Sequence, residues 1–232
     1  MATPDATVQF KERLGGRPEP KCVVELSAVH GVSLREIESA VSPDERLRVN
    51  SIRLAWFPAL RVDDVRGLAS LFPNTSQVLA WTHAAGDRAW LPALLDFPRL
   101  RALDLAVPQL TRRDMHVVPL GRISRVALAA EGLSAADLCG LCWSGLSSLT
   151  LSGPGCTLGL QLGSHLARTN LKRLVLIEPS LHAMRQLPEL LSCGHGWSVQ
   201  ILLAPAVRGG TKRRIRQAAS EQQHRLDWKA DE

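Results

Sequence analysis

The stretch Leu146-Ser147-Ser148-Leu149-Thr150-Leu151 decides the fold, because its pattern L-x-x-L-x-L returns along the chain. Clean copies are LRALDL at 100–105, ISRVAL at 123–128 and LKRLVL at 171–176, and weaker ones are VNSIRL at 49–54, TSQVLA at 75–80 and VQIL at 199–202. The third apolar position of these copies falls at residues 54, 80, 105, 128, 151, 176 and 201, which lie 23 to 26 residues apart. A shorter first copy, VVEL, ends at Leu26. This regular period predicts a repeat architecture.

Each repeat is expected to contain one short strand and one helical segment. Alternate residues of L-x-L point to the same face of a β-strand, and the residues after each copy carry apolar side chains at helical spacing. Ser134-Ala-Ala-Asp137 has the residues of a helix start. One strand and one helix cannot bury a core alone, but seven or eight stacked units can. The strands are therefore predicted near residues 53, 79, 104, 127, 150, 175 and 200.

The pattern resembles the leucine-rich-repeat family over roughly residues 22–205. As in that family, a fourth apolar residue follows the clean copies, at Leu110, Leu133, Cys156 and Leu181. The Asn or Cys that the family usually places before this residue is absent, and Pro108, Glu131, Pro154 and Pro179 stand there instead. The chain is therefore more similar to irregular, ribonuclease-inhibitor-like intracellular members. The resemblance implies an α/β solenoid with a curved parallel sheet on its concave side and helices on its convex side.

Three segments are expected along the chain. Residues 1–21 are predicted to form an N-terminal extension or cap, residues 22–207 the solenoid of seven or eight repeats, and residues 208–232 a basic helical tail. The chain has 28 Lys and Arg against 22 Asp and Glu, and a formal net charge of +6. Five of these basic residues fall within the nine residues 208–216, which contain no acid. The rest of the chain is therefore close to neutral.

The basic tail is the first candidate site. Gly209 and Gly210 are expected to form a hinge, followed by a helix from Thr211 to Trp228 with Thr211 as its N-cap. Positive charges near a helix start oppose the helix dipole unless an anion lies close by, and phosphate is the natural candidate. The residues predicted to contact RNA are Arg208, Lys212, Arg213, Arg214 and Arg216. The alternative is a solvated helix that caps the solenoid.

The concave face of the predicted sheet is the second candidate site. Residues between the inward leucines point out of this face, and several of them are large and apolar, although a solvated sheet favours polar ones. Exposed apolar patches often mark interaction surfaces, and Trp is a frequent interface anchor. The candidates for partner binding are Arg53, Leu79, Trp81, Asp104, Arg125, Val175, Ile177 and Leu202. The alternative is that the terminal regions fold over these side chains as caps.

The sequence gives no support to catalysis or to metal or cofactor binding. Cys139, Cys142, Cys193 and His195 resemble a zinc set, but the repeat frame places the two pairs on helices roughly 20 Å apart, since neighbouring helices pack about 8–10 Å from each other. Zinc–thiolate bonds are near 2.3 Å. No G-x-S-x-G elbow, Walker motif or G-x-G-x-x-G is present. We therefore expect a protein that is not an enzyme and needs neither a cofactor nor a small-molecule substrate.

Cysteine usage and hydropathy indicate the compartment. Five Cys, an odd number, favour reduced thiols in an intracellular protein. The cytoplasm is the first expectation, and an organelle or the nucleus stays open. The uncharged stretch over 138–167 contains Gly153-Pro154-Gly155, which would break a membrane-spanning helix. The function predicted is that of a protein–protein interaction scaffold or subunit of an intracellular assembly, without membrane contact. The alternative is a ribonucleoprotein component that binds RNA through its tail.

Overall fold

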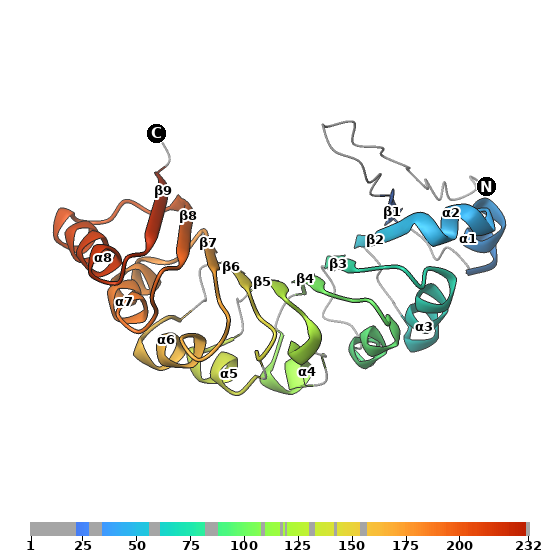
Figure 1. Ribbon diagram of the computed structural model, residues 1–232, viewed down its shortest axis with the longest axis horizontal. Helices are drawn as coiled ribbons and strands as arrows, with labels where there is room; N and C mark the ends of the chain where they lie inside the picture. The colour runs from blue at the N-terminus through green and yellow to red at the C-terminus, as the bar shows by residue number, and fades with distance from the viewer. Residues whose placement is uncertain are drawn as a thin grey trace. The chain divides into compact units, whose positions relative to one another are not determined.

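A computed structural model of the chain describes residues 22–27, 34–55, 61–81, 88–107, 110–116, 118, 120–129, 133–141, 143–153 and 157–230. Two compact units divide this part of the chain. The first contains strands β1 to β4, and the second contains the elements from α4 to β9 (Figure 1). The N-terminal extension predicted over residues 1–21 lies outside the described residues.

The first unit alternates parallel strands with short helices. Its strands pair in chain order, each with the next, and the register shifts once, between Cys22 and Val23. The elements are β1 (Cys22–Ser27), α1 (Leu34–Ala40), α2 (Pro43–Arg48), β2 (Val49–Ala55), α3 (Val62–Leu71), β3 (Gln77–Trp81), the 3-10 helix η1 (Leu91–Asp96) and β4 (Ala102–Ala106). Helix α3 is one of the helical segments expected between strands, and its apolar residues Val65 and Leu68 are buried.

The second unit continues the same alternation. Its five strands also pair in chain order and in parallel. The elements are α4 (Arg112–His116), the 3-10 helix η2 (Leu120–Arg122), β5 (Arg125–Ala129), α5 (Ala135–Cys139), β6 (Ser148–Ser152), α6 (Leu160–Leu166), β7 (Arg173–Ile177), α7 (Leu181–Leu191), β8 (Ser198–Ala204), α8 (Gly209–Glu221) and β9 (Arg225–Ala230). Helices α5 to α8 lie on one side of strands β5 to β9 (Figure 1).

The predicted strand positions and core are confirmed. In the second unit, the inward residues form columns across the strands, such as Leu149 beside Leu174 and Leu151 beside Leu176. These four side chains are at most 2% exposed. In the first unit, Leu103 and Leu105 continue columns that include Ile52 and Leu54 on β2. The chain is thus an α/β protein in which parallel strands alternate with helices in a solenoid-like arrangement.

Hydrogen bonds between successive turns support the strand stacking at the amino ends of the strands. The carbonyl oxygen of Ser147 accepts bonds from the backbone N–H groups of Lys172 and Arg173, at 2.8 and 3.1 Å. The hydroxyl of Ser147 donates to the carbonyl oxygen of Ser124 at 3.0 Å. Neighbouring repeats therefore satisfy each other's backbone polar groups at the amino ends of the strands.

Helix starts follow the sequence at α5 but not at α8. Ser134 caps α5, and its side chain and that of Asp137 form a reciprocal capping box, as the sequence predicted. The prediction for the tail is wrong at both ends of its helix. Helix α8 begins at Gly209, so the glycine pair forms the first turn rather than a hinge, and Thr211 lies inside the helix. The helix ends at Glu221, because Gln223 takes a left-handed conformation (φ 56°) that turns the chain into β9.

The segment after residue 208 therefore belongs to the repeat array. Helix α8 packs against α7, and β9 pairs with β8. The residues of α8 that face the core are Ile215, Ala218 and Ala219. Among the described helices, none is both long enough and apolar enough to cross a membrane.

A buried histidine joins this last repeat to the one before it. The backbone N–H of Trp197 donates to Nδ1 of His224 at 2.9 Å, and Nε2 of His224 lies 2.9 Å from the carbonyl oxygen of Leu191. Since Nδ1 accepts a bond, Nε2 carries the proton and donates to Leu191. The His224 and Trp197 rings stack with centroids 5.1 Å apart. The neutral imidazole therefore fits this place, and the imidazolium does not.

Acidification is expected to destabilise the protein through His224. Burial lowers the pKa of His224 below its ordinary value of 6.5, and the nearby His195 lowers it further, while the bond to Leu191 raises it. The unfolded chain therefore takes up the proton first, so stability is complete above the unfolded pKa and falls as the pH drops toward the lowered folded pKa. Urea unfolding at pH 7.5 and pH 5.5 measures the loss. The loss is expected to be smaller in H224Q, and an equal loss in both proteins would contradict this assignment.

Candidate interaction surfaces

The strand face opposite the helices is the first candidate surface, and we call it the open face. In the second unit it consists of three rows of residues that run across the strands in register. The rows are, from the amino ends of the strands, Arg125, Ser148, Arg173, Ser198 and Arg225; then Ala127, Thr150, Val175, Gln200 and Asp227; then Ala129, Ser152, Ile177 and Leu202. This face corresponds to the one predicted to be concave.

The apolar candidates of the second unit lie side by side on this face, but they are less exposed than predicted. Ile177 on β7 pairs with Leu202 on β8, and both are partly exposed. Val175 is only 6% exposed, so the prediction of an exposed Val175 is wrong. It is a short side chain with the longer Arg173 and Gln200 beside it. The next residue of β8, Leu203, adds exposed apolar surface in a left-handed turn (49% exposed, φ 51°).

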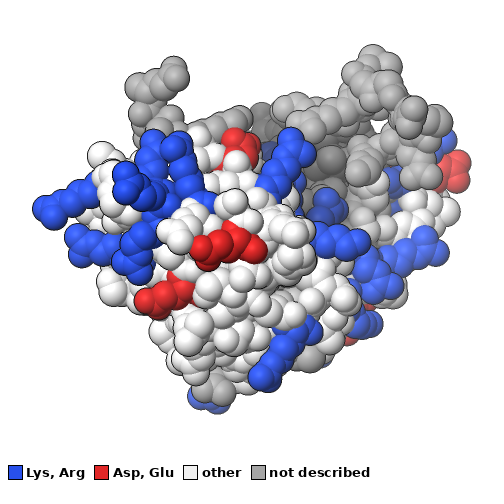
Figure 2. Space-filling view, turned by 60° about the vertical axis from the view of Figure 1, so that its left-hand side comes forward, with Lys and Arg blue, Asp and Glu red and all other residues white. Residues whose placement is uncertain are grey.

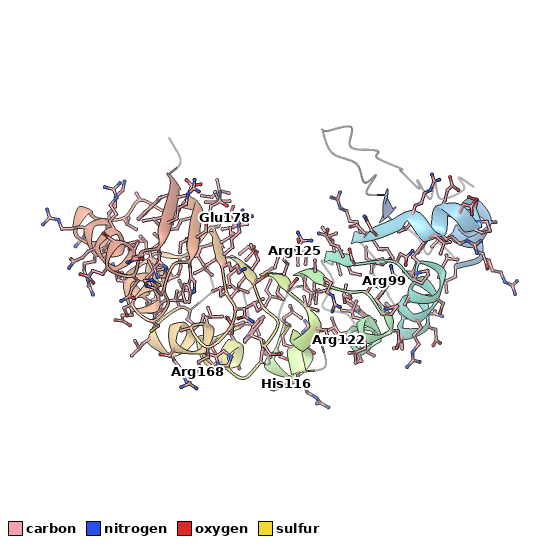
Figure 3. The ribbon with its side chains drawn as sticks, in the orientation of Figure 1. Arg99, His116, Arg122, Arg125, Arg168 and Glu178 are labelled. Atoms are coloured by element: carbon pink, nitrogen blue, oxygen red, sulfur yellow. The ribbon has the colours of Figure 1, made fainter. Side chains whose placement is uncertain are left out.

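Sequence reasoning identified one member of the arginine row and missed two. Arg125 is exposed, as are Arg173 and Arg225, and a small serine separates each arginine from the next. Figure 3 places Arg125 on the strand side of the second unit and Arg168 beside α6 on the helix side. The missed residues directly precede an inward leucine, a position that also points out of the open face. Alternation within the strand would have revealed them.

A chain of hydrogen bonds crosses the open face from β7 to β9. Nη2 of Arg173 donates to Oε1 of Gln200 at 2.9 Å, and Nε2 of Gln200 donates to Oδ2 of Asp227 at 3.3 Å. The Arg125 and Arg225 side chains form no hydrogen bond or ion pair with other described residues. The two ends of the arginine row therefore keep their charge available to a partner.

In the first unit the open face brings together three of the predicted residues. Arg53, Leu79 and Asp104 occupy matched positions on β2, β3 and β4, and each is partly exposed. The Nε atom of Arg53 is buried and makes no hydrogen bond itself, while the residue makes a further interaction with its surroundings. Trp81 ends β3, but its side chain lies outside the described residues.

The second candidate surface is the outer side of α8. Arg208, Arg213, Arg214 and Arg216 are exposed, and their side chains form no ion pair or hydrogen bond within the described part of the chain. Lys212 is partly buried, with Nζ 5.4 Å from the centre of the Trp228 ring. Figure 2 shows Lys and Arg side chains gathered at this end of the second unit.

The charges of α8 do not serve the stability of the helix. Its first turn carries no acidic residue, its N-cap Arg208 makes no side-chain capping bond, and Glu221 stands at its last turn. The charges of Arg208 at the N-cap and Glu221 at the last turn oppose the helix dipole, and a favourable charge near a helix end contributes about 0.3–1 kcal/mol. No basic residue lies in the last turn of α8, where a positive charge would stabilise the helix.

The described cysteines do not form a metal site. Cys139 and Cys193 are partly exposed free thiols, and burial raises the pKa of the Cys139 thiol. Cys193 lies near Ser164 and the carbonyl oxygens of Leu160 and Glu189. The described residues contain no group of three or more His, Cys, Asp or Glu side chains that could hold a metal ion. Cys142 lies outside them.

Comparison with known proteins adds no relative to these observations. No protein-family model matches the chain, and no curated protein is significantly similar to it in sequence.

Proposed function

We propose that this chain is a leucine-rich-repeat protein that acts, without catalysing a reaction, as a protein–protein interaction scaffold or subunit of an intracellular assembly. The partner binds the open face. The observation that carries the proposal is that this face combines apolar and basic residues. Ile177 and Leu202 lie toward the carboxyl ends of the strands, and a row of arginines lies at their amino ends. In the second unit, helices α5 to α8 all lie on the other side of the strands (Figure 1). Apolar side chains left on such a face are typical of an interaction surface.

The family assignment rests on the repeat itself. The L-x-x-L-x-L copies fall on strands β2 to β8, each followed by a turn and, in most cases, a helix or 3-10 helix. A period of 20 to 29 residues is typical of leucine-rich repeats. Repeat solenoids serve many unrelated systems, so the function is proposed from the surface and not from the fold.

Removing the apolar contacts of the open face is expected to reduce recovery of the partner. The double variant I177S/L202S removes both adjacent side chains, and an interface anchor contributes on the order of 1–2 kcal/mol, so about a tenfold loss or more is expected. Affinity purification with quantitative mass spectrometry measures it, with nuclease treatment to remove complexes bridged by RNA. W81A tests the corresponding face of the first unit.

The matched control is L160S/L181S, which removes two exposed leucines (59% and 47%) from the helix layer of the same unit. It is expected to leave recovery unchanged. If both double variants recover the partner as well as the unaltered protein, the open face is not the binding surface.

A second candidate function is that of a ribonucleoprotein component, with α8 as the RNA contact. The observation in its favour is the exposed set Arg208, Arg213, Arg214 and Arg216, which has no partner among the described residues. Phosphate contacts by such residues make binding steeply dependent on salt. Sensitivity of the purified complex to nuclease separates the two functions.

A further inference from the structure

The arginine row of the second unit has a regular spacing that restricts what can bind it. Arg125, Arg173 and Arg225 lie on every second strand, with Ser148 and Ser198 between them. Neighbouring strands are about 4.8 Å apart, so successive arginines start about 10 Å from each other. Like charges directly opposite one another in a sheet are destabilising. The serines avoid that contact and leave three separate positive positions along a line.

A second line, of apolar residues, runs parallel to the arginine row. Ile177 lies four residues beyond Arg173 on β7, and Leu202 lies beside it on β8. Four residues of a strand span about 13 Å. Between the two lines the floor on β5 to β7 consists of Ala127, Thr150 and Val175, which are small or buried. On β8 and β9 the floor continues as Gln200 and the exposed Asp227. The open face therefore has a basic border along its whole width, a floor that is low on β5 to β7, and an apolar border on β7 and β8.

An α-helix laid across the strands fits these dimensions. Its diameter with side chains is about 10–12 Å, which matches the space between the two lines. Its rise of about 1.5 Å per residue places residues i and i+7 about 10.5 Å apart, close to the spacing of the arginines. Glu178 is exposed just beyond Ile177, so the opposite border carries a carboxylate (Figure 3). Acidic residues are thus favoured on only one flank of the helix.

We infer that the partner presents an amphipathic helix with acidic residues at seven-residue spacing on one flank and apolar residues on the other. This inference rests on the proposed function and specifies the chemistry of its partner. The acidic flank contacts Arg125, Arg173 and Arg225, and the apolar flank covers Ile177 and Leu202. A protein helix is favoured over RNA because the apolar border has no counterpart in a phosphate backbone. Asp227 on β9 accepts a bond from Gln200 and adds one negative charge beside the row, against the three positive charges of the arginines.

The test uses the full chain and a synthetic 21-residue helical peptide with Glu at positions 1, 8 and 15 and leucines on the facing flank. A peptide of the same composition, with Glu at positions 1, 6 and 11, is the control, because its acids point in different directions around the helix. Calorimetry or fluorescence anisotropy measures both affinities. The peptide with Glu at positions 1, 8 and 15 is expected to bind at least tenfold more tightly than its control. Equal affinities, or no binding of either peptide, would overturn the inference.

Variants of the protein locate the contact. We expect each of the single variants R125A, R173A and R225A to lower the affinity for the peptide with seven-residue Glu spacing about fivefold, which is the most that an exposed ion pair contributes. The triple variant is expected to lower this affinity about a hundredfold. The three side chains are exposed, so thermal melting is expected to be unchanged. If the triple variant binds the peptide as well as the unaltered protein, the arginine row is not the contact. Displacement of the peptide by a 20-nucleotide uridine RNA that itself needs the three arginines would also overturn the inference.

The two proposals fail in different ways. If partner recovery depends on Ile177 and Leu202 but the peptide does not bind, the open face is the binding surface and only the helix inference is wrong. If partner recovery does not depend on Ile177 and Leu202 and the peptide does not bind, both the proposed function and the helix inference are wrong.

Discussion

Replacing Leu149 by alanine is expected to lower the free energy of unfolding by about 2–5 kcal/mol, the cost of truncating a leucine in a packed core. Leu149 is fully buried and lies in register between Val126 on β5 and Leu174 on β7. In a stacked array each repeat contacts its two neighbours, so the cavity removes contacts on both sides. Urea unfolding followed by circular dichroism measures the change, and L151A is expected to fall in the same range.

The control for this prediction is L160A. Leu160 opens α6 and is 59% exposed, so its truncation removes little buried surface. Substitutions at such positions usually change stability by less than about 0.5 kcal/mol. A change this small for L149A would mean that the inward column is wrongly assigned, since the same substitution would then cost no more in the core than on the surface.

The inward columns could be predicted because period and alternation agree. In L-x-x-L-x-L the third position recurs at the repeat length, and the residue two before it points to the same side of the strand. Leu103 and Leu105 satisfy both conditions, and so do Leu174 and Leu176, and all four are buried. A register error of one residue would have turned every such pair outward. Few other patterns in this sequence are restricted so strongly.

The ninth strand was missed although its signal is present. Leu226 and Trp228 pair with Val199 and Ile201, so they occupy the two inward positions of one more repeat. Residues 211–228 contain no glycine or proline, and the absence of a breaker favoured one uninterrupted helix. The turn is instead made at Gln223 in a left-handed conformation, which glycine or asparagine adopts more readily. Local propensity does not reveal this stop, whereas extending the repeat period by one more unit would have placed a strand there.

Side chains and turns outside the repeat pattern explain two other differences between the predicted and the observed burial, at Val175 and at Leu181. Val175 is buried because of its longer neighbours, and burial of an outward residue depends on the side chains of adjacent strands. Leu181, expected as the inward residue after β7, is 47% exposed, and Pro179 is buried in its place. Glu178 takes a left-handed conformation (φ 51°) directly after β7, so the chain turns inward earlier than the family pattern predicts. Neither effect is visible in one repeat read alone.

Replacing Arg213, Arg214 and Arg216 by alanine is expected to remove most RNA binding if α8 is a phosphate contact. Each contact of a basic residue with single-stranded nucleic acid contributes about 0.7 to the slope of log affinity against log salt. Loss of three contacts therefore reduces the slope by roughly 2 units. A labelled 20-nucleotide uridine RNA, titrated at several salt concentrations, measures both slope and affinity. The three side chains are exposed on one helix and lie beyond its first turn, so stability is expected to be unchanged.

The triple variant R125A/R173A/R225A is the matched control for this experiment, because it lowers the net charge by the same three units on the open face. A reduced slope in the α8 variant alone assigns the RNA contact to α8. Equal reductions in both variants would mean that RNA follows net charge and that neither surface is a specific site. If the open-face variant alone loses RNA binding, the arginine row is the nucleic-acid contact, and the proposed acidic helix is excluded from it. The same pair of variants thus decides between two partners of opposite chemistry on one chain.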